Sequence, residues 1–150
     1  MRGCLPNKDL LVEYGLTDHF GPLCDSIKSG NIIKFNHELD IRKIWLMENK
    51  CYSILKFRTR VILYRNFFRK VFFISHSIDS KMNNSLEVIA SMFNLFIDPE
   101  IGLDDVESII ASIMDQGYIR GYILHSRQLV VFAKNDPFPT PYQQSLARRG

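Results

Sequence analysis

The sequence predicts a mostly α-helical chain in which short helical hairpins are followed by a winged helix-turn-helix with a small β-hairpin. Two observations lead to this prediction. Apolar residues recur at helical spacing between residues 7 and 117, with Gly and Pro at the breaks between helices. From residue 118 the pattern changes to the alternation of two short strands. Three helices followed by a hairpin are the order of elements in a winged helix.

The helical part is expected to cover residues 5–57 and to begin with three short helices. In "NKDLLVEYGL", Asn7 suits a helix N-cap and Gly15 suits a helix end. In "GPLCDSIKSG", Pro22 is expected near a helix start and Gly30 at the C-cap. The apolar residues of the third helix are Ile32, Phe35, Leu39 and Ile44.

The winged part is expected to cover residues 58–136. Its three helices are predicted at residues 62–74, 85–96 and 103–117, and its wing at residues 118–134. In the wing, "HSRQ" separates two strands whose alternating residues are Tyr118, Tyr122 and Leu124, then Leu129, Val131 and Ala133. Residues 137–150 form a proline-containing tail. We expect Phe138 to hold this tail on the domain; the alternative is that the prolines bind an aromatic groove.

The third helix of the winged part, in "GLDDVESIIASIMDQG", has the clearest pattern. Asp104 is expected to cap it, Glu107 to complete a capping box, and Gly117 to close it. Its apolar stripe comprises Val106, Ile109, Ile110 and Ile113. Its exposed positions include Asp104, Asp105, Glu107, Asp115 and Gln116. Carboxylates repel phosphates, so we expect this helix to pack or to contact protein rather than to read DNA.

The segment "KFRTRVILYRNFFRKVFFI", residues 56–74, holds six Lys or Arg, six aromatic residues and no Asp or Glu. On a helical wheel, one arc gathers Arg58, Arg65, Asn66, Arg69 and Lys70, together with Ile62. Arg60 falls within the opposite, apolar arc, which favours a helix break near residues 59–61. One face is therefore expected to pack and the other to be charged.

The basic arc has three interpretations, which are a solvated face, a nucleic-acid contact and a membrane-surface contact. The lack of interleaved acidic residues and the adjacent wing favour nucleic acid. A membrane contact is not favoured, because a core helix of a winged domain needs the broad apolar arc in any case.

The wing adds further positive charge through Arg120, His125, Arg127 and Lys134. Tyr118 and Tyr122 either stack on unpaired bases or, as we favour, pack inward. Backbone-led, salt-sensitive binding to RNA or DNA is expected. The predicted nucleic-acid-binding residues are Arg58, Arg65, Arg69, Lys70, Arg120, Arg127 and Lys134.

The composition is that of a folded intracellular protein. Hydrophobic residues make up 46% of the chain and aromatic residues 12%, which is enough for a core. Cys4, Cys24 and Cys51 are odd in number and lack C-x-x-C spacing, which favours reduced thiols in the cytosol or nucleus. The first ten residues have no apolar h-region, and the chain has no run of about 18 apolar residues, so neither a signal peptide nor a transmembrane helix is expected.

No enzyme chemistry is expected from the motifs. The four histidines are scattered and have no metal-ligand spacing with a cysteine. The sequence has neither a Gly-rich phosphate loop nor a G-x-S-x-G nucleophile motif. We therefore predict neither a catalytic site nor a metal site nor a cofactor.

Motifs along the chain resemble a known family. "YRNFFRKVF", "GLDDVESIIASIMDQGYIRGYI", "LVVFAKNDPFP" and "LLVEYGL…IKSGNIIKFNHEL" are similar to the corresponding parts of PCI-domain proteins. Over about residues 5–140, the chain resembles the C-terminal portion of the PCI subunit of a nuclear mRNA-export complex, transcription-and-export complex 2. Family members carry a longer set of N-terminal helical hairpins. Relatives associated with the COP9 signalosome share much of the "YRN" motif.

The resemblance implies a non-catalytic adaptor in the nucleus, with the cytoplasm as a second location. Its implied partners are a larger PCI scaffold subunit of the GANP type, a small acidic peptide subunit, and RNA or DNA. Arg65, Arg69 and Lys70 lie in the matching motif. The alternative is a purely structural PCI subunit of a COP9-signalosome, proteasome-lid or translation-initiation type complex, in which the basic face meets an acidic protein.

Overall fold

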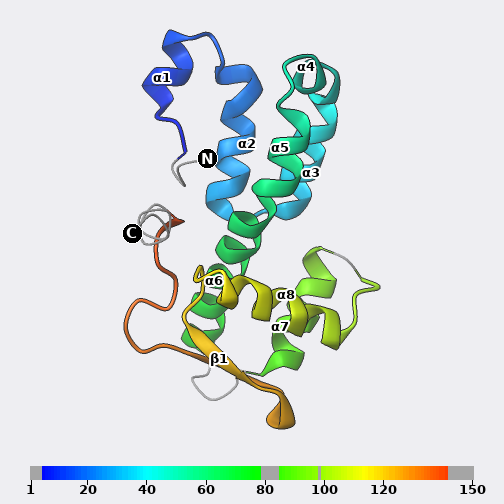
Figure 1. Cartoon of the computed structure of the whole chain (residues 1–150), viewed down its shortest axis with the longest axis vertical. Coiled ribbons are helices and arrows are strands. Elements are labelled where there is room, and N and C mark those ends of the chain that lie inside the picture. Colours follow the sequence, from blue (N-terminus) through cyan, green and yellow to red (C-terminus); the bar gives the residue numbers. More distant parts are fainter. Residues whose placement is uncertain (1–4, 79–84, 98, 142–150) are drawn as a thin grey trace. The chain divides into compact units, whose positions relative to one another are not determined.

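The computed structural model describes residues 5–78, 85–97 and 99–141. These residues are mostly helical and contain one small antiparallel sheet, which confirms the predicted fold class (Figure 1). The chain divides into two compact units that meet inside helix α6, between Phe67 and Phe68. No helix among the described residues has both the length and the apolar character that crossing a bilayer requires.

The first unit is helical and contains a chain of successive helix pairs. Its elements are α1 (Lys8–Glu13), α2 (Thr17–Ser29), α3 (Ile32–Ile41), α4 (Lys43–Glu48), α5 (Tyr52–Arg58) and the first part of α6 (Arg60–Ile78). From α1 to α5, each helix packs on the next (Figure 1). Gly15 and Gly30 follow α1 and α2 with left-handed φ values of 62° and 64°, so both helices end at the glycines that the sequence predicts.

Pro22 lies inside α2 and not near its start as predicted, because the helix begins earlier, at Thr17. Proline has no N–H, so the carbonyl oxygen of Asp18, four residues earlier, receives no helical hydrogen bond from position 22. Arg42 provides the missing donor: its Nε donates to the Asp18 carbonyl oxygen at 2.8 Å. A contact between distant segments therefore makes the proline compatible with this helix.

Arg42 also divides the predicted third helix, because it lies between the end of α3 and the start of α4. Its guanidinium pairs with the Glu38 carboxylate. The predicted apolar residues on α3 are buried, whereas Ile44 on α4 is 77% exposed. The prediction that Ile44 continues the buried stripe is wrong, since the helical register does not carry across the break.

The C-terminal end of α2 lies directly against α6. A Cβ atom at Gly30 would be 2.7 Å from the backbone nitrogen of Phe67 and 2.8 Å from the backbone carbon of Asn66. The side-chain Nδ2 of Asn66 donates to the Ile27 carbonyl oxygen at 2.7 Å. The Gly30 N–H donates to the same oxygen at 3.2 Å. A side chain of α6 thus donates a hydrogen bond to a carbonyl oxygen in the last turn of α2.

The second unit has the predicted winged order of three helices and a hairpin. After the rest of α6 come α7 (Leu86–Phe96), α8 (Leu103–Asp115), β1 (Gly121–Leu124), a 3-10 turn η1 (His125–Arg127) and β2 (Leu129–Phe132). The strands are antiparallel, with Gly121 opposite Phe132 and Leu124 opposite Leu129. α7 and α8 lie close to their predicted bounds, whereas α6 begins earlier and ends later than predicted.

The core of the second unit lies between α7, α8 and the hairpin. Its buried residues on these elements are Leu86, Ile89, Ala90, Phe93, Val106, Ile110, Ile113 and Val130. Phe138 is 6% exposed, and its ring centroid lies 5.6 Å from that of Phe72 and 5.4 Å from that of Phe132. The prediction that Phe138 holds the tail on the domain is therefore confirmed. Residues 142–150 of the predicted tail lie outside the described residues.

The cap of α8 differs from the prediction. Gly102, and not Asp104, is the N-cap residue, and its N–H donates to Oδ2 of Asp105 at 3.2 Å. Glu107 is thus not part of a capping box. The sequence "GLDD" offers two adjacent carboxylates, and the one that lies three residues after the actual cap makes the bond. Gly117 follows the helix with a left-handed φ of 74°, as predicted.

The buried face of the wing is not the one that the sequence predicts, which carries Tyr118 and Tyr122. Val130 is fully buried, whereas Tyr122 is 57% exposed and Tyr118 is half-buried. Tyr122 pairs with Val131, so it points to the face opposite Val130. Inward packing of Tyr122 is therefore wrong. Alternation establishes that two faces exist but does not say which one is buried.

Gly30→Ala is expected to lower the free energy of unfolding more than Gly15→Ala. Both changes place an L-residue at left-handed φ, which costs about 1–2 kcal/mol. Only at position 30 must the new Cβ also displace the α6 backbone, whereas no described atom lies within 4 Å of a Cβ at position 15. Urea denaturation followed by circular dichroism measures both losses. Equal losses would show that α6 does not constrain position 30.

Candidate nucleic-acid interface

The predicted nucleic-acid-binding residues are distributed over both units. All of them are exposed except Arg65. The exposed ones are Arg58 at the end of α5 in the first unit, and in the second unit Arg69 and Lys70 on α6, Arg120 before β1, Arg127 in η1 and Lys134 after β2. The winged second unit therefore carries most of the exposed predicted cations.

The basic arc of the helical wheel belongs to two helices. α5 ends at Arg58 and α6 begins at Arg60, which confirms the predicted break near residues 59–61. Thr59 between them is buried. Arg60 does not join an apolar face: it is exposed, and its Nε donates to the hydroxyl oxygen of Tyr64 at 3.0 Å.

Arg65 does not lie on an exposed basic face, and this part of the prediction is wrong. Its residue exposure is 5%, and its Nη1 donates to Oδ1 of Asn66 at 2.6 Å. Asn66 in turn donates to the Ile27 carbonyl oxygen. Arg65 and Asn66, the last two residues of "YRN", therefore link α6 to the end of α2. A wheel drawn for one helix shows neither this neighbour nor the burial that it causes.

Some exposed cations of the second unit already have intramolecular contacts. Nη1 of Arg120 lies 3.0 Å from Oδ2 of Asp136, and both side chains are about half exposed. The guanidinium of Arg69 lies 5.5 Å from the ring centroid of Phe73. In the described part of the chain, Lys70, Arg127 and Lys134 make no ion pair. These three residues offer the least compensated positive charge of the predicted set.

The acidic helix α8 contacts the wing through its carboxylate at Glu107. His125 Nδ1 lies 2.9 Å from Oε1 and 3.0 Å from Oε2 of Glu107. Asp104, Asp105 and Asp115 are exposed on the same helix. His125 is thus engaged with an acidic residue, so the wing's uncompensated charge comes mainly from Arg127 and Lys134.

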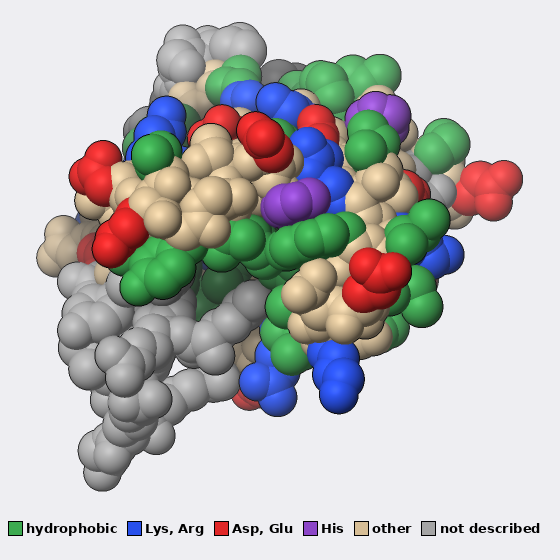
Figure 2. Space-filling model, turned by 90° about the horizontal axis from the view of Figure 1, so that it is seen from above, with side chains coloured by type: hydrophobic (Ala, Val, Ile, Leu, Met, Phe, Trp, Pro, Cys, Tyr) green, Lys and Arg blue, Asp and Glu red, His purple; other side chains and the backbone are tan. Residues whose placement is uncertain are grey.

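The surface of the chain also contains apolar and mixed regions. Figure 2 shows a face on which hydrophobic side chains lie among both basic and acidic ones. Exposed large hydrophobic residues of the second unit are Phe73, Ile74, Leu95, Phe96 and Tyr122. Apolar exposure of this kind suits a protein contact, whereas the exposed Tyr122 ring on a wing that also carries exposed cations suits a base.

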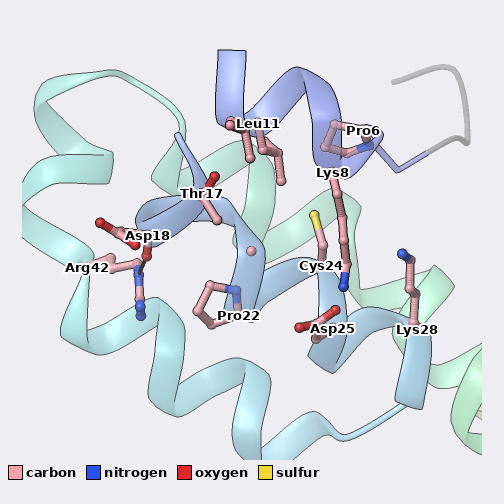
Figure 3. Close-up of a pocket in the computed structure, with 12 residues that line it drawn as sticks. Pro6, Lys8, Leu11, Thr17, Asp18, Pro22, Cys24, Asp25, Lys28 and Arg42 are labelled. Carbon is pink, nitrogen blue, oxygen red and sulfur yellow. Dashed lines mark hydrogen bonds between the residues drawn. The ribbon is translucent and has the colours of Figure 1, made fainter. Parts of the chain in front are cut away.

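A pocket of about 410 Å³ lies between α1 and α2 in the first unit (Figure 3). Leu11, Pro22 and Cys24 line it, together with charged side chains that include Lys8 and Asp25. Burial raises the pKa of the Cys24 thiol, and nearby Lys28 only partly opposes this effect. A thiol that stays protonated is a poor nucleophile, so the pocket offers no activated cysteine. Among the described residues, no group of His, Cys, Asp and Glu is arranged to hold a metal ion.

The residue predictions missed a second pocket of the first unit, between α3 and the α5–α6 segment. Its aromatic and basic lining includes Tyr52, Lys56, Arg60 and Tyr64. The sequence does contain a signal for it, since these residues recur at intervals of four. The helix break at Thr59 obscures this signal on a single wheel.

Comparison with known proteins gives one consistent result. Residues 7–134 match the family model of the PCI domain. The chain is 37% identical over 149 residues to a PCI domain-containing protein of Schizosaccharomyces pombe, covering 96% of this chain and 34% of that protein. It is 37% identical over 134 residues to the PCI domain-containing protein 2 homolog of Dictyostelium discoideum, covering 89% and 30%. It is 34% identical over 140 residues to the Protein CSN12 homolog of Schizosaccharomyces pombe, covering 90% and 31%. The chain thus spans about a third of the length of these curated relatives.

Arg65→Gln is expected to destabilise the chain, whereas Arg69→Gln leaves stability nearly unchanged. The first change removes a buried side chain that donates to Asn66, which costs about 1–3 kcal/mol. The second alters an exposed side chain, for which about 0.5 kcal/mol or less is usual. Urea midpoints of the two variants test this order. A smaller loss for Arg65→Gln than for Arg69→Gln would contradict the structural role of Arg65.

Proposed function

Because the chain belongs to the PCI domain family, we propose that it is a non-catalytic adaptor subunit of a nuclear mRNA-export complex. In this role it binds a larger PCI scaffold subunit of the GANP type and a small acidic subunit. Its winged second unit contributes a basic surface to RNA or DNA. The family resemblance of "YRNFFRKVF" and "KNDPFP" supports these partners and the nuclear location.

The observation that supports nucleic-acid contact best is the set of exposed cations without ion pairs in the described part of the second unit. Arg127 lies in the turn at the tip of the wing, and Lys134 follows the second wing strand. The exposed ring of Tyr122 lies on the first wing strand. Exposed cations and an exposed aromatic ring on one hairpin suit a backbone-led contact with an unpaired strand.

The scaffold contact is supported by apolar exposure at the C-terminal end of α7. Leu95 is 72% exposed and Phe96 is 51% exposed. Large apolar side chains on a helix end gain free energy when a partner removes them from water. The same residues support the alternative function, a purely structural subunit of a COP9-signalosome, proteasome-lid or translation-initiation type complex. The two functions differ in whether the wing cations contact nucleic acid or an acidic protein.

A triple variant with Lys70→Glu, Arg127→Glu and Lys134→Glu is expected to lose affinity for single-stranded RNA. Each phosphate contact to a single strand contributes about 0.7 to the slope of log affinity against log salt concentration. The variant should therefore bind more weakly at low salt and show a shallower slope. Fluorescence anisotropy with a labelled RNA at several salt concentrations measures both quantities.

A charge-matched control has Lys8→Glu, Lys34→Glu and Lys50→Glu, all at exposed positions of the first unit. It changes the net charge by the same amount, so equal losses in the two triple variants would mean that net charge and not the wing determines binding. Wild type that binds no RNA at low salt would contradict the nucleic-acid contact and would favour the purely structural subunit.

A further inference from the structure

The first unit contains a pocket of about 260 Å³ with an aromatic and basic lining. It lies between α3 on one side and α5 with the start of α6 on the other. Pockets for drug-sized ligands usually measure about 300–1,000 Å³, so this one suits a smaller group. None of its residues belongs to the predicted nucleic-acid-binding set, and all of them lie in the first unit.

The apolar part of the pocket is preformed. The lining residues Ile32, Phe35, Leu39 and Leu63 are each 6% exposed or less, so they belong to the core and provide a fixed surface. Tyr52 from α5 and Tyr64 from α6 are half-buried in the same lining. A planar aromatic ligand can therefore contact aliphatic side chains and two phenol rings.

Positive charge accompanies the two rings. The Nζ atoms of Lys56 and Lys43 lie 5.6 Å and 5.8 Å from the ring centroid of Tyr52. The guanidinium of Arg60 lies 5.7 Å from the ring centroid of Tyr64. Lys56 and Arg60 also line the pocket and are exposed. The chain has no acidic residue between Glu48 and Asp79, so α5 and α6 contribute only positive charge here.

Two polar residues of α3 complete the lining. Asn36 and Asp40 are exposed at the pocket, and the Asp40 carboxylate is its acidic group. A carboxylate accepts hydrogen bonds from the N–H groups of a base such as guanine. Three cations, Lys43, Lys56 and Arg60, lie at or near the pocket with this one carboxylate, so its surroundings carry a net positive charge.

We propose that this pocket binds one nucleotide of a single-stranded RNA, with the base against Tyr52 and the phosphate on Lys56 and Arg60. Entry of a base displaces an exposed ammonium from the Tyr52 ring, and that ammonium then contacts the phosphate. The site goes beyond the proposed function, because it places a nucleotide subsite in the first unit. An acidic peptide without aromatic residues satisfies the cations equally well but has no planar group for the rings, so a nucleotide uses more of the pocket.

The test uses guanosine monophosphate and the full 150-residue chain. A single nucleotide is small enough to occupy the pocket alone, and the residues whose amide signals shift show whether it binds there or at the wing. Titration followed by ¹H–¹⁵N correlation spectra should shift the amide signals of residues around Tyr52 and Lys56. Tyr52→Ala should weaken the affinity at least about fivefold, since base stacking on an aromatic side chain is worth at least that much.

Two further variants separate stacking from folding. Tyr52→Phe keeps the ring and should retain affinity, whereas Lys56→Gln removes an exposed charge without disturbing the core and should weaken binding. Lys34→Gln is the matched control, because Lys34 is exposed on α3 but does not line the pocket. Dispersed spectra and an unchanged urea midpoint confirm that each variant is folded.

Several results would overturn the nucleotide site. These are no shifts at millimolar nucleotide, full affinity in Tyr52→Ala, or displacement of the nucleotide by inorganic phosphate at equal concentration. Binding of a poly-glutamate peptide in place of the nucleotide would identify a peptide site instead. The wing variant with Arg127→Glu and Lys134→Glu should retain nucleotide binding in full. If the wing variant alone loses its affinity for long RNA, the result supports the proposed function of the wing. If Tyr52→Ala alone loses nucleotide binding, the result supports the nucleotide site in this pocket.

Discussion

The close approach of α6 to the end of α2 is the constraint on which the first unit depends. Gly30 permits it, because any Cβ at this position would overlap the α6 backbone. Asn66 uses it, because its amide donates to the Ile27 carbonyl oxygen at the end of α2. Arg65 then donates to Asn66 and is buried in doing so. The close approach at Gly30 and the hydrogen bonds of Arg65 and Asn66 thus form one connection between helices that are distant along the chain.

Because of this connection, the basic residues of α6 have two different roles, one structural and one at the surface. The cations of α6 look alike in the sequence, but Arg65 is buried whereas Arg69 and Lys70 are exposed. The exposed positions belong to the winged second unit, where the wing adds Arg127 and Lys134. Charge available to a nucleic acid therefore depends on burial, and the number of Lys and Arg in the segment overstates it.

Other charged residues also make contacts within the chain. Arg42 donates to the Asp18 carbonyl oxygen, which Pro22 leaves without its helical donor. Glu107 pairs with His125 and joins α8 to the wing. In the pocket around Tyr52 the cations lie over aromatic rings, and this weak contact keeps them near the proposed nucleotide site. Polar residues of this chain thus stabilise helix ends, connect elements or remain available at the surface.

Local sequence signals suffice to predict the helix, helix, helix, hairpin order of the winged part, the approximate bounds of α7 and α8, the glycines that end helices, and the break before α6. These features depend on local conformational preference and on the period of apolar residues, which a sequence records directly. Three other features emerge from the packing of distant segments: Arg65 is buried, Tyr122 is exposed, and Tyr52 and Tyr64 line one pocket. The reason is physical: period and composition specify a face, but burial of a side chain depends on which distant segment packs against that face.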